Sequence, residues 1–296
     1  MILWNGEPTK ICYLDSCILT FLLSENELQK KILNSEYVYA ISIFNIYERC
    51  KNKEYYAKTL DLLGRVPVII FKHFDQLLDT EIKYYHYDYL PIFELVAPYG
   101  TLVRPEVLKG LRQTMESKDI QQHANLFKVQ KQGIIDGYLS LRKNFIVNRN
   151  ITNSRNADQF VLDSMVERLT SKNSAFMRNL VEEMMKVNKQ WQDERQKVPK
   201  EINKQIQLGL LPNIYKFSSW AIPLYLVFYR YYVGTDKPKI SDVADLAMSS
   251  VYAYCDVIMT EHNQGNKILM IKKNHPVLQN TEIWVSEGQD NILPIG

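Results

Sequence analysis

The sequence predicts an α/β fold in which a parallel sheet is flanked by helices and interrupted by a mostly α-helical insertion. Residues 1–71 alternate short apolar runs with helical patterns, and the same alternation returns in residues 236–296. Such alternation is typical of parallel sheets. Helical periodicity dominates residues 72–235. We therefore expect a discontinuous core, formed by residues 1–71 and 236–296, and a helical insertion over residues 72–235.

In the first core segment, the apolar runs predict strands over residues 10–15, 37–42 and 66–71. Helical spacing predicts helices over residues 16–23 and 25–33, and one long helix from residue 43 to residue 63 with Gly64 as its cap. In the insertion, we expect a long helix over about residues 156–192 and a buried aromatic helix over residues 220–233. In the second core segment, Ser241 is expected to cap a helix through residue 254, followed by strands over residues 257–260, 267–272 and 283–285.

Composition excludes several classes of protein. With 46% hydrophobic and 23% charged residues, the chain has ample material for a core and is not expected to be disordered. The N-terminal residues lack a signal-peptide pattern, and no apolar run reaches the roughly 20 residues that span a bilayer. The four cysteines form no paired Cys-x-x-Cys units, so we expect free thiols rather than a zinc site. These features predict a cytoplasmic protein without a membrane role.

Charge is distributed unevenly along the chain. Residues 101–235 hold 21 of the 36 Lys and Arg residues but only 12 of the 33 Asp and Glu residues. This asymmetry is typical of a basic surface for a polyanion, although solvated helix faces would account for it equally well. Four basic residues surround one polar loop and are candidates for contacts with RNA phosphates: Arg142, Lys143, Arg149 and Arg155.

Four acidic residues follow predicted strands or lie in helices beside the same edge of the sheet: Asp15, Glu48, Asp245 and Glu261. Ligands of α/β proteins bind at the carboxyl ends of the strands. Carboxylates there suit Mg²⁺ or Mn²⁺, and a divalent cation beside a basic surface suits phosphodiester hydrolysis. Taken singly, each acid could instead be an exposed helix residue or a cap. That alternative is strongest for Asp242, which can cap a helix, and for Asp256, which precedes a strand and could bind backbone amides.

Three segments resemble the PIN-like nuclease family: YLDSCIL from residue 13, SIFNIYE from residue 42, and DLAM to YCDVIMTE over residues 245–261. The resemblance implies a metal-dependent endoribonuclease that leaves 5′-phosphates. It assigns Asp15, Glu48 and Asp245 as catalytic ligands of Mg²⁺ or Mn²⁺, with Glu261 as the fourth acid where the family usually carries Asp. Its supporting residues would be the hydroxyl groups of Ser16, Ser42 and Thr260 together with Asp242 and Asp256.

The function expected from this resemblance is hydrolysis of RNA, with tRNA or single-stranded RNA as substrate. Such an activity suits the toxin of a toxin–antitoxin pair or an antiviral defence effector, and we expect a regulatory protein partner because unrestrained cleavage would harm the cell. The alternative is a catalytically weak or inactive PIN-like module that binds RNA or protein. A flap-type DNA nuclease is a third, weaker alternative.

Overall fold

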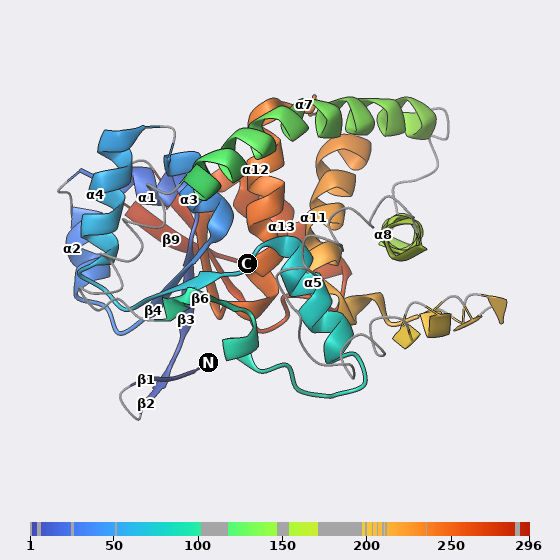
Figure 1. The fold of residues 1–296 in the computed structure, drawn as a ribbon, viewed down its shortest axis with the longest axis horizontal. Coiled ribbons are helices and arrows are strands. Elements are labelled where there is room, and N and C mark those ends of the chain that lie inside the picture. Colours follow the sequence, from blue (N-terminus) through green and yellow to red (C-terminus); the bar gives the residue numbers. More distant parts are fainter. Residues whose placement is uncertain are drawn as a thin grey trace.

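A seven-stranded mixed sheet organises the chain, in the order β6-β5-β4-β3-β7-β8-β9 (Figure 1). The computed structural model describes residues 2–4, 7–24, 27–50, 52–101, 118–146, 154–170, 212–234, 236–287 and 291–296, with 197–198, 200–202, 204–205, 207–208 and 210. The central strands β5 (Val68–Phe71), β4 (Val38–Ser42), β3 (Ile11–Leu14), β7 (Val257–Glu261) and β8 (Glu282–Glu287) run parallel. The edge strands β6 (Val96–Thr101) and β9 (Asn291–Ile295) are antiparallel. The predicted α/β class is confirmed, and the sheet is parallel except at its edges.

The central strands are almost continuously apolar because both faces of the sheet are covered. Every residue of β3, β4 and β5 is buried. This burial explains why the sequence shows unbroken apolar runs there rather than alternation. A separate small hairpin, β1 (Ile2–Trp4) with β2 (Glu7–Thr9), leads into β3.

Helices α1 (Ser16–Phe21), α2 (Glu27–Leu33), α3 (Ile43–Arg49) and α4 (Lys53–Leu63) connect the first parallel strands. The prediction of one helix over residues 43–63 was wrong, because Asn52 adopts an extended conformation and its side chain caps a new helix. The predicted strand at 267–272 was also wrong. Those residues belong to α13 (His262–Asn274), which buries Ile268 and Ile271 on one face. Short apolar runs do not distinguish a strand from a helix.

The insertion supplies α5 (Phe74–Lys83), the short helix η1 (Ile92–Glu94), α7 (Lys118–Ile146), α8 (Ser154–Thr170), η3 (Ile214–Lys216) and α11 (Ser218–Val227). It also supplies the edge strand β6, so a boundary at residue 72 cuts one strand from the sheet. A π-helical turn, η4 (Phe228–Val233), continues α11. Of the helix predicted over residues 156–192, α8 covers the first part, and residues 171–192 lie outside the described residues.

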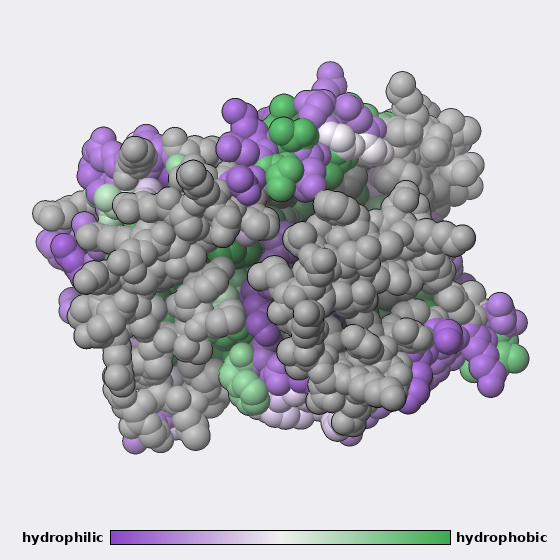
Figure 2. All heavy atoms as spheres, in the orientation of Figure 1, coloured by the Kyte–Doolittle hydropathy of each residue, from purple (hydrophilic) through white to green (hydrophobic). Residues whose placement is uncertain are grey.

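Helix α7 lies across the top of the molecule and contacts α12 (Ile240–Met248) and α3 (Figure 1). Figure 2 shows hydrophilic and hydrophobic atoms together over this helix. Leu126 and Val129 of α7 are exposed. Lys239 precedes α12 as its cap residue, so the prediction that Ser241 caps this helix was wrong. The 3₁₀-helix η5 (Ser249–Tyr254) then leads to β7.

The described part of the chain bears on membrane-spanning helices and on the state of the cysteines. It contains no helix that is both long enough and apolar enough to cross a bilayer. Its four cysteines are free thiols, and Cys12 and Cys255 are buried.

Candidate active site

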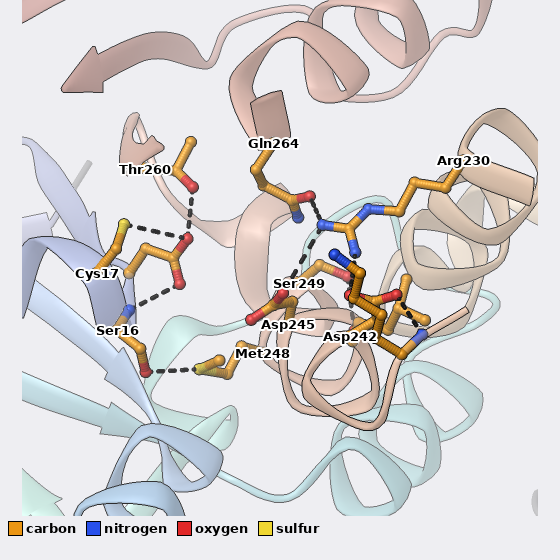
Figure 3. A network of polar contacts seen from close by, with 12 residues as sticks. Ser16, Cys17, Arg230, Asp242, Asp245, Met248, Ser249, Thr260 and Gln264 are labelled. Carbon is orange, nitrogen blue, oxygen red and sulfur yellow. Dashed lines mark hydrogen bonds and ion pairs between the residues drawn. The ribbon is translucent and has the colours of Figure 1, made fainter. Parts of the chain in front are cut away.

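Asp15 stands where β3 ends and α1 begins, at the carboxyl edge of the sheet. Its backbone N–H donates to the Met259 carbonyl of β7, and its side chain caps α1 by accepting from the Ser16 N–H at 2.7 Å. The second carboxylate oxygen accepts from the Thr260 hydroxyl, with the Cys17 thiol on the same oxygen at 4.0 Å (Figure 3). Only 5% of Asp15 is exposed. Burial raises the pKa of its carboxyl to about 6, although both hydrogen bonds favour the charged form.

Asp245 lies in α12 and is electrostatically coupled to the other predicted acids. Burial and then the charge of Asp15, with smaller contributions from Glu48 and Glu261, raise the pKa of its carboxyl to about 7, although Arg230 opposes the shift. Glu48 and Glu261 also raise the pKa of Asp15. Like charges shift one another only when they are close. The structure therefore brings these four acids, which we call the acid cluster, to one edge of the sheet.

Arg230 of the π-helical turn opposes this negative charge (Figure 3). It is 5% exposed, and its guanidinium lies 3.6 Å from the Asp242 carboxylate and 3.9 Å from that of Asp245. It also donates to the side-chain carbonyl of Gln264 in α13. Asp242 accepts from the Tyr231 hydroxyl at 2.8 Å. Asp242 therefore acts on the acid cluster indirectly, by sharing Arg230 with Asp245.

Glu48 meets a second buried cation, which the sequence did not single out. Its Oε1 lies 3.7 Å from Nζ of Lys131 in α7, and its Oε2 accepts from the Ser16 hydroxyl at 3.1 Å. The Lys131 side chain is 4% exposed, whereas that of Glu48 is 24% exposed. One signal could have revealed Lys131: it lies four residues before the buried Ile135 and therefore shares the inward face of the helix.

A buried amide, also missed by sequence reasoning, fixes the hydroxyl between these groups. Asn45 Nδ2 donates to the Ser16 hydroxyl at 3.1 Å, while Asn45 Oδ1 accepts from the Ser42 N–H and the Tyr13 hydroxyl. Ser42 itself caps α3 through the Phe44 N–H. The Ser42 hydroxyl, which was expected to support the site, is engaged in this cap. Asn45 is the residue of α3 that supports the acid cluster.

Asp256 does not join the acid cluster. Its carboxylate accepts from the Ile11 N–H at 2.9 Å, at the amino ends of β3 and β7. A strand of five residues spans about 16 Å, which separates Asp256 from Glu261 at the other end of β7. The predicted supporting role at the site is wrong, and the alternative of a backbone-amide acceptor is correct.

Of the predicted basic residues, only Arg155 can be placed by its side chain, which is exposed in the first turn of α8. The side chains of Arg142 and Lys143, and the whole of Arg149, lie outside the described residues. Their role in binding RNA stays a prediction.

The donor set has the chemistry that a hard cation requires. Carboxylate oxygens are the preferred protein ligands of Mg²⁺, which commonly keeps several waters and takes only one or two protein carboxylates. In the described part of the chain, no three Asp, Glu, His or Cys side chains are grouped so that they could ligate one ion together. A cation at this edge would therefore be held by one or two carboxylates together with waters.

Comparisons with family models, with curated proteins and with solved structures found no match to this chain. The resemblance to PIN-like nucleases therefore depends on the three motifs and on the placement of their residues.

Proposed function

We propose that the protein is a metal-dependent ribonuclease with a PIN-like active site. One observation carries the proposal: four acids from separate parts of the chain lie close enough at the carboxyl edge of the sheet to raise the pKa of Asp15 and Asp245. Folding does not favour such an accumulation of like charge. A site that binds cations explains why the chain tolerates it.

Asp15 and Asp245 would hold the cation, because they lie at the same edge of the sheet and are the two carboxyls whose pKa the neighbouring acids raise. When bound, a divalent cation supplies charge stabilisation for a phosphate and makes water more acidic. Thr260 and the Ser16 N–H hold the Asp15 carboxylate in one orientation. The Ser16 hydroxyl does the same for Glu48, whose partial exposure lets it accept a proton from water.

The two buried cations have a complementary part in this proposal. Arg230 lies beside Asp245, and Lys131 lies beside Glu48. They limit its net negative charge, which would otherwise repel a phosphodiester. Because Lys131 comes from α7, the insertion contributes a side chain directly to the site.

A second candidate function is a binding module without catalysis. It is favoured by the fact that the acids already have protein partners: Asp15 accepts hydrogen bonds, Glu48 meets Lys131, and Asp245 meets Arg230. In that case the side chains of Lys131 and Arg230 would neutralise the acids in place of a metal ion.

The decisive experiment is to incubate the purified protein with single-stranded RNA, tRNA and branched DNA in the presence of Mn²⁺ or Mg²⁺. An Asp15→Asn/Asp245→Asn variant should lose cleavage. An Asp136→Asn/Asp163→Asn variant removes two exposed carboxylates outside the acid cluster and should retain it. Equal cleavage by all three proteins, or cleavage of none of the substrates by the wild type, would refute the catalytic assignment. Preference for branched DNA would instead support the flap-type alternative.

A further inference from the structure

A cavity of about 300 Å³ opens beside the acid cluster, between α1 and the junction of α3 with α4. Its wall includes Glu48 of the acid cluster and Ser16, whose hydroxyl donates to Glu48. The remaining lining residues are Cys17, Thr20, Arg49, Asn52 and Tyr55. Sites for small molecules start at about this volume, so the cavity has room for one nucleotide and not for a duplex.

Arg49 is a buried cation in the wall of this cavity. It is 9% exposed, and its Nη2 donates to the Ser16 carbonyl and to the Thr20 hydroxyl. Both acceptors are uncharged. Burial lowers the pKa of the guanidinium, and the more distant charge of Glu48 opposes that effect. Within the part of the chain that the structure describes, Arg49 makes no ion pair, and Glu48 pairs with Lys131 instead.

A buried charge without a paired opposite charge is costly, and an anion entering the cavity would compensate it. Arginine is also the side chain that best matches the geometry of a phosphate group. Arg49 therefore gives the cavity a preference for a phosphate.

Tyr55 and Asn52 give the cavity the features that recognise a base. Tyr55 lies in the first turns of α4, and 46% of it is exposed although it is a large aromatic residue. Asn52 caps α4 with its side-chain oxygen, which accepts from the Glu54 N–H at 3.0 Å. This use of the oxygen leaves the amide nitrogen of Asn52 as the group that can donate to a ligand. Sites for single-stranded nucleic acid combine positive charge, which holds the backbone, with aromatic rings on which bases stack.

We propose that this cavity binds one nucleotide of a single-stranded RNA next to the bond that the acid cluster would cleave. Arg49 contacts a phosphate, the base stacks on Tyr55, and Asn52 donates to the base edge. This inference rests on the proposed ribonuclease function, and it adds to it that the substrate is unpaired at this position. A base held in a duplex could not stack on Tyr55.

The test measures binding of a fluorescent single-stranded RNA hexamer by anisotropy, in the Asp15→Asn/Asp245→Asn background so that no cleavage occurs. Adding Tyr55→Ala should weaken binding roughly 5- to 150-fold, the range that loss of one stacked base produces. Tyr55→Phe keeps the ring and should stay within about twofold of the parent. Tyr87→Ala removes another exposed tyrosine, one that does not line the cavity, and should leave binding unchanged.

Arg49→Gln provides an independent arm. Loss of one phosphate contact should reduce the slope of log Kd against log salt by about 0.7, an effect that a merely structural role would not produce. Thermal melting establishes that each variant is folded. If Arg49→Gln does not fold, the Tyr55 variants still decide the question.

Two results would overturn the inference: parental affinity in Tyr55→Ala, or equal weakening of single-stranded and duplex RNA by that variant. Neither result bears on hydrolysis, which is measured separately in the wild type. Conversely, if the wild type cleaves no RNA but Tyr55-dependent binding is found, the ribonuclease proposal fails and the nucleotide site stands.

Discussion

Replacing Asp245 by Asn should stabilise the protein in the absence of divalent cations, although it should abolish cleavage. The pKa of this carboxyl rises from an ordinary 3.8 to about 7 on folding, through burial and through repulsion by the other three acids. Three pKa units correspond to about 4 kcal/mol if fully realised. Because 34% of the side chain is exposed, solvent screening reduces this to about 1–2 kcal/mol. Losing the 3.9 Å contact with Arg230 offsets part of the gain, but Arg230 keeps Asp242.

The pH dependence of this stabilisation follows from proton binding by Asp245. A raised pKa means that the folded state holds the proton more tightly than the unfolded state, so this contribution stabilises the fold as the pH falls from about 7 toward 3.8. Asp245→Asn lacks the titrating group. Its advantage over the wild type should therefore be largest near pH 8 and should shrink toward about pH 5.

The assay is thermal unfolding in EDTA, near pH 8 and near pH 5. A gain of 1–2 kcal/mol should raise Tm by about 2–3 °C near pH 8. Asp242→Asn is the matched control. Asp242 accepts charge-assisted hydrogen bonds from the Lys239 N–H and the Tyr231 hydroxyl, so the same change there should destabilise the protein. Added Mn²⁺ should raise Tm of the wild type and not of Asp245→Asn. A lower Tm for Asp245→Asn at both pH values would show that the acids do not repel one another as the structure indicates.

Three further predictions concern other parts of the structure. Lys131→Met should reduce the free energy of unfolding in urea by about 1–3 kcal/mol, because it leaves Glu48 without its cation, whereas Lys131→Arg should recover most of the loss. His275 is buried, and burial lowers the pKa of its imidazole. Its contribution to stability is therefore present above the unfolded pKa of about 6.5 and is lost as the pH falls. Between about pH 7 and pH 5, His275→Gln should lose less Tm than the wild type. Gly265→Ala should cost about 1–3 kcal/mol in the same urea assay, because a Cβ there would collide with the Val285 side chain, and unchanged stability would show that α13 can move away from β8.

Local sequence patterns were enough to predict the strands of the parallel core. The runs ending at Asp15, Ser42 and Phe71 are apolar because they are buried on both faces, and such runs leave a clear signal. Where a pattern depended on tertiary context, the prediction failed. The apolar run at 267–272 belongs to α13, since its apolar residues cover the sheet on one helical face only. The edge strand β6 was missed because it lies in a range dominated by helical periodicity.

Some residues of the candidate site could likewise be predicted from the sequence, and others could not. Sequence alone brought Asp15, Glu48, Asp245 and Glu261 to notice, because residues at the ends of parallel strands meet at one edge whatever the details of packing. Only the tertiary structure could show that Lys131, Arg230 and Asn45 contact the site. Each of these reaches the acids through contacts between segments distant in the sequence, and nothing in a local pattern reports such contacts. Tertiary structure also moved Asp256 to the opposite edge of the sheet, where it binds a backbone amide. The order of strands thus determines which acids can meet, and the packing of helices against that edge decides which cations and hydroxyl groups meet them.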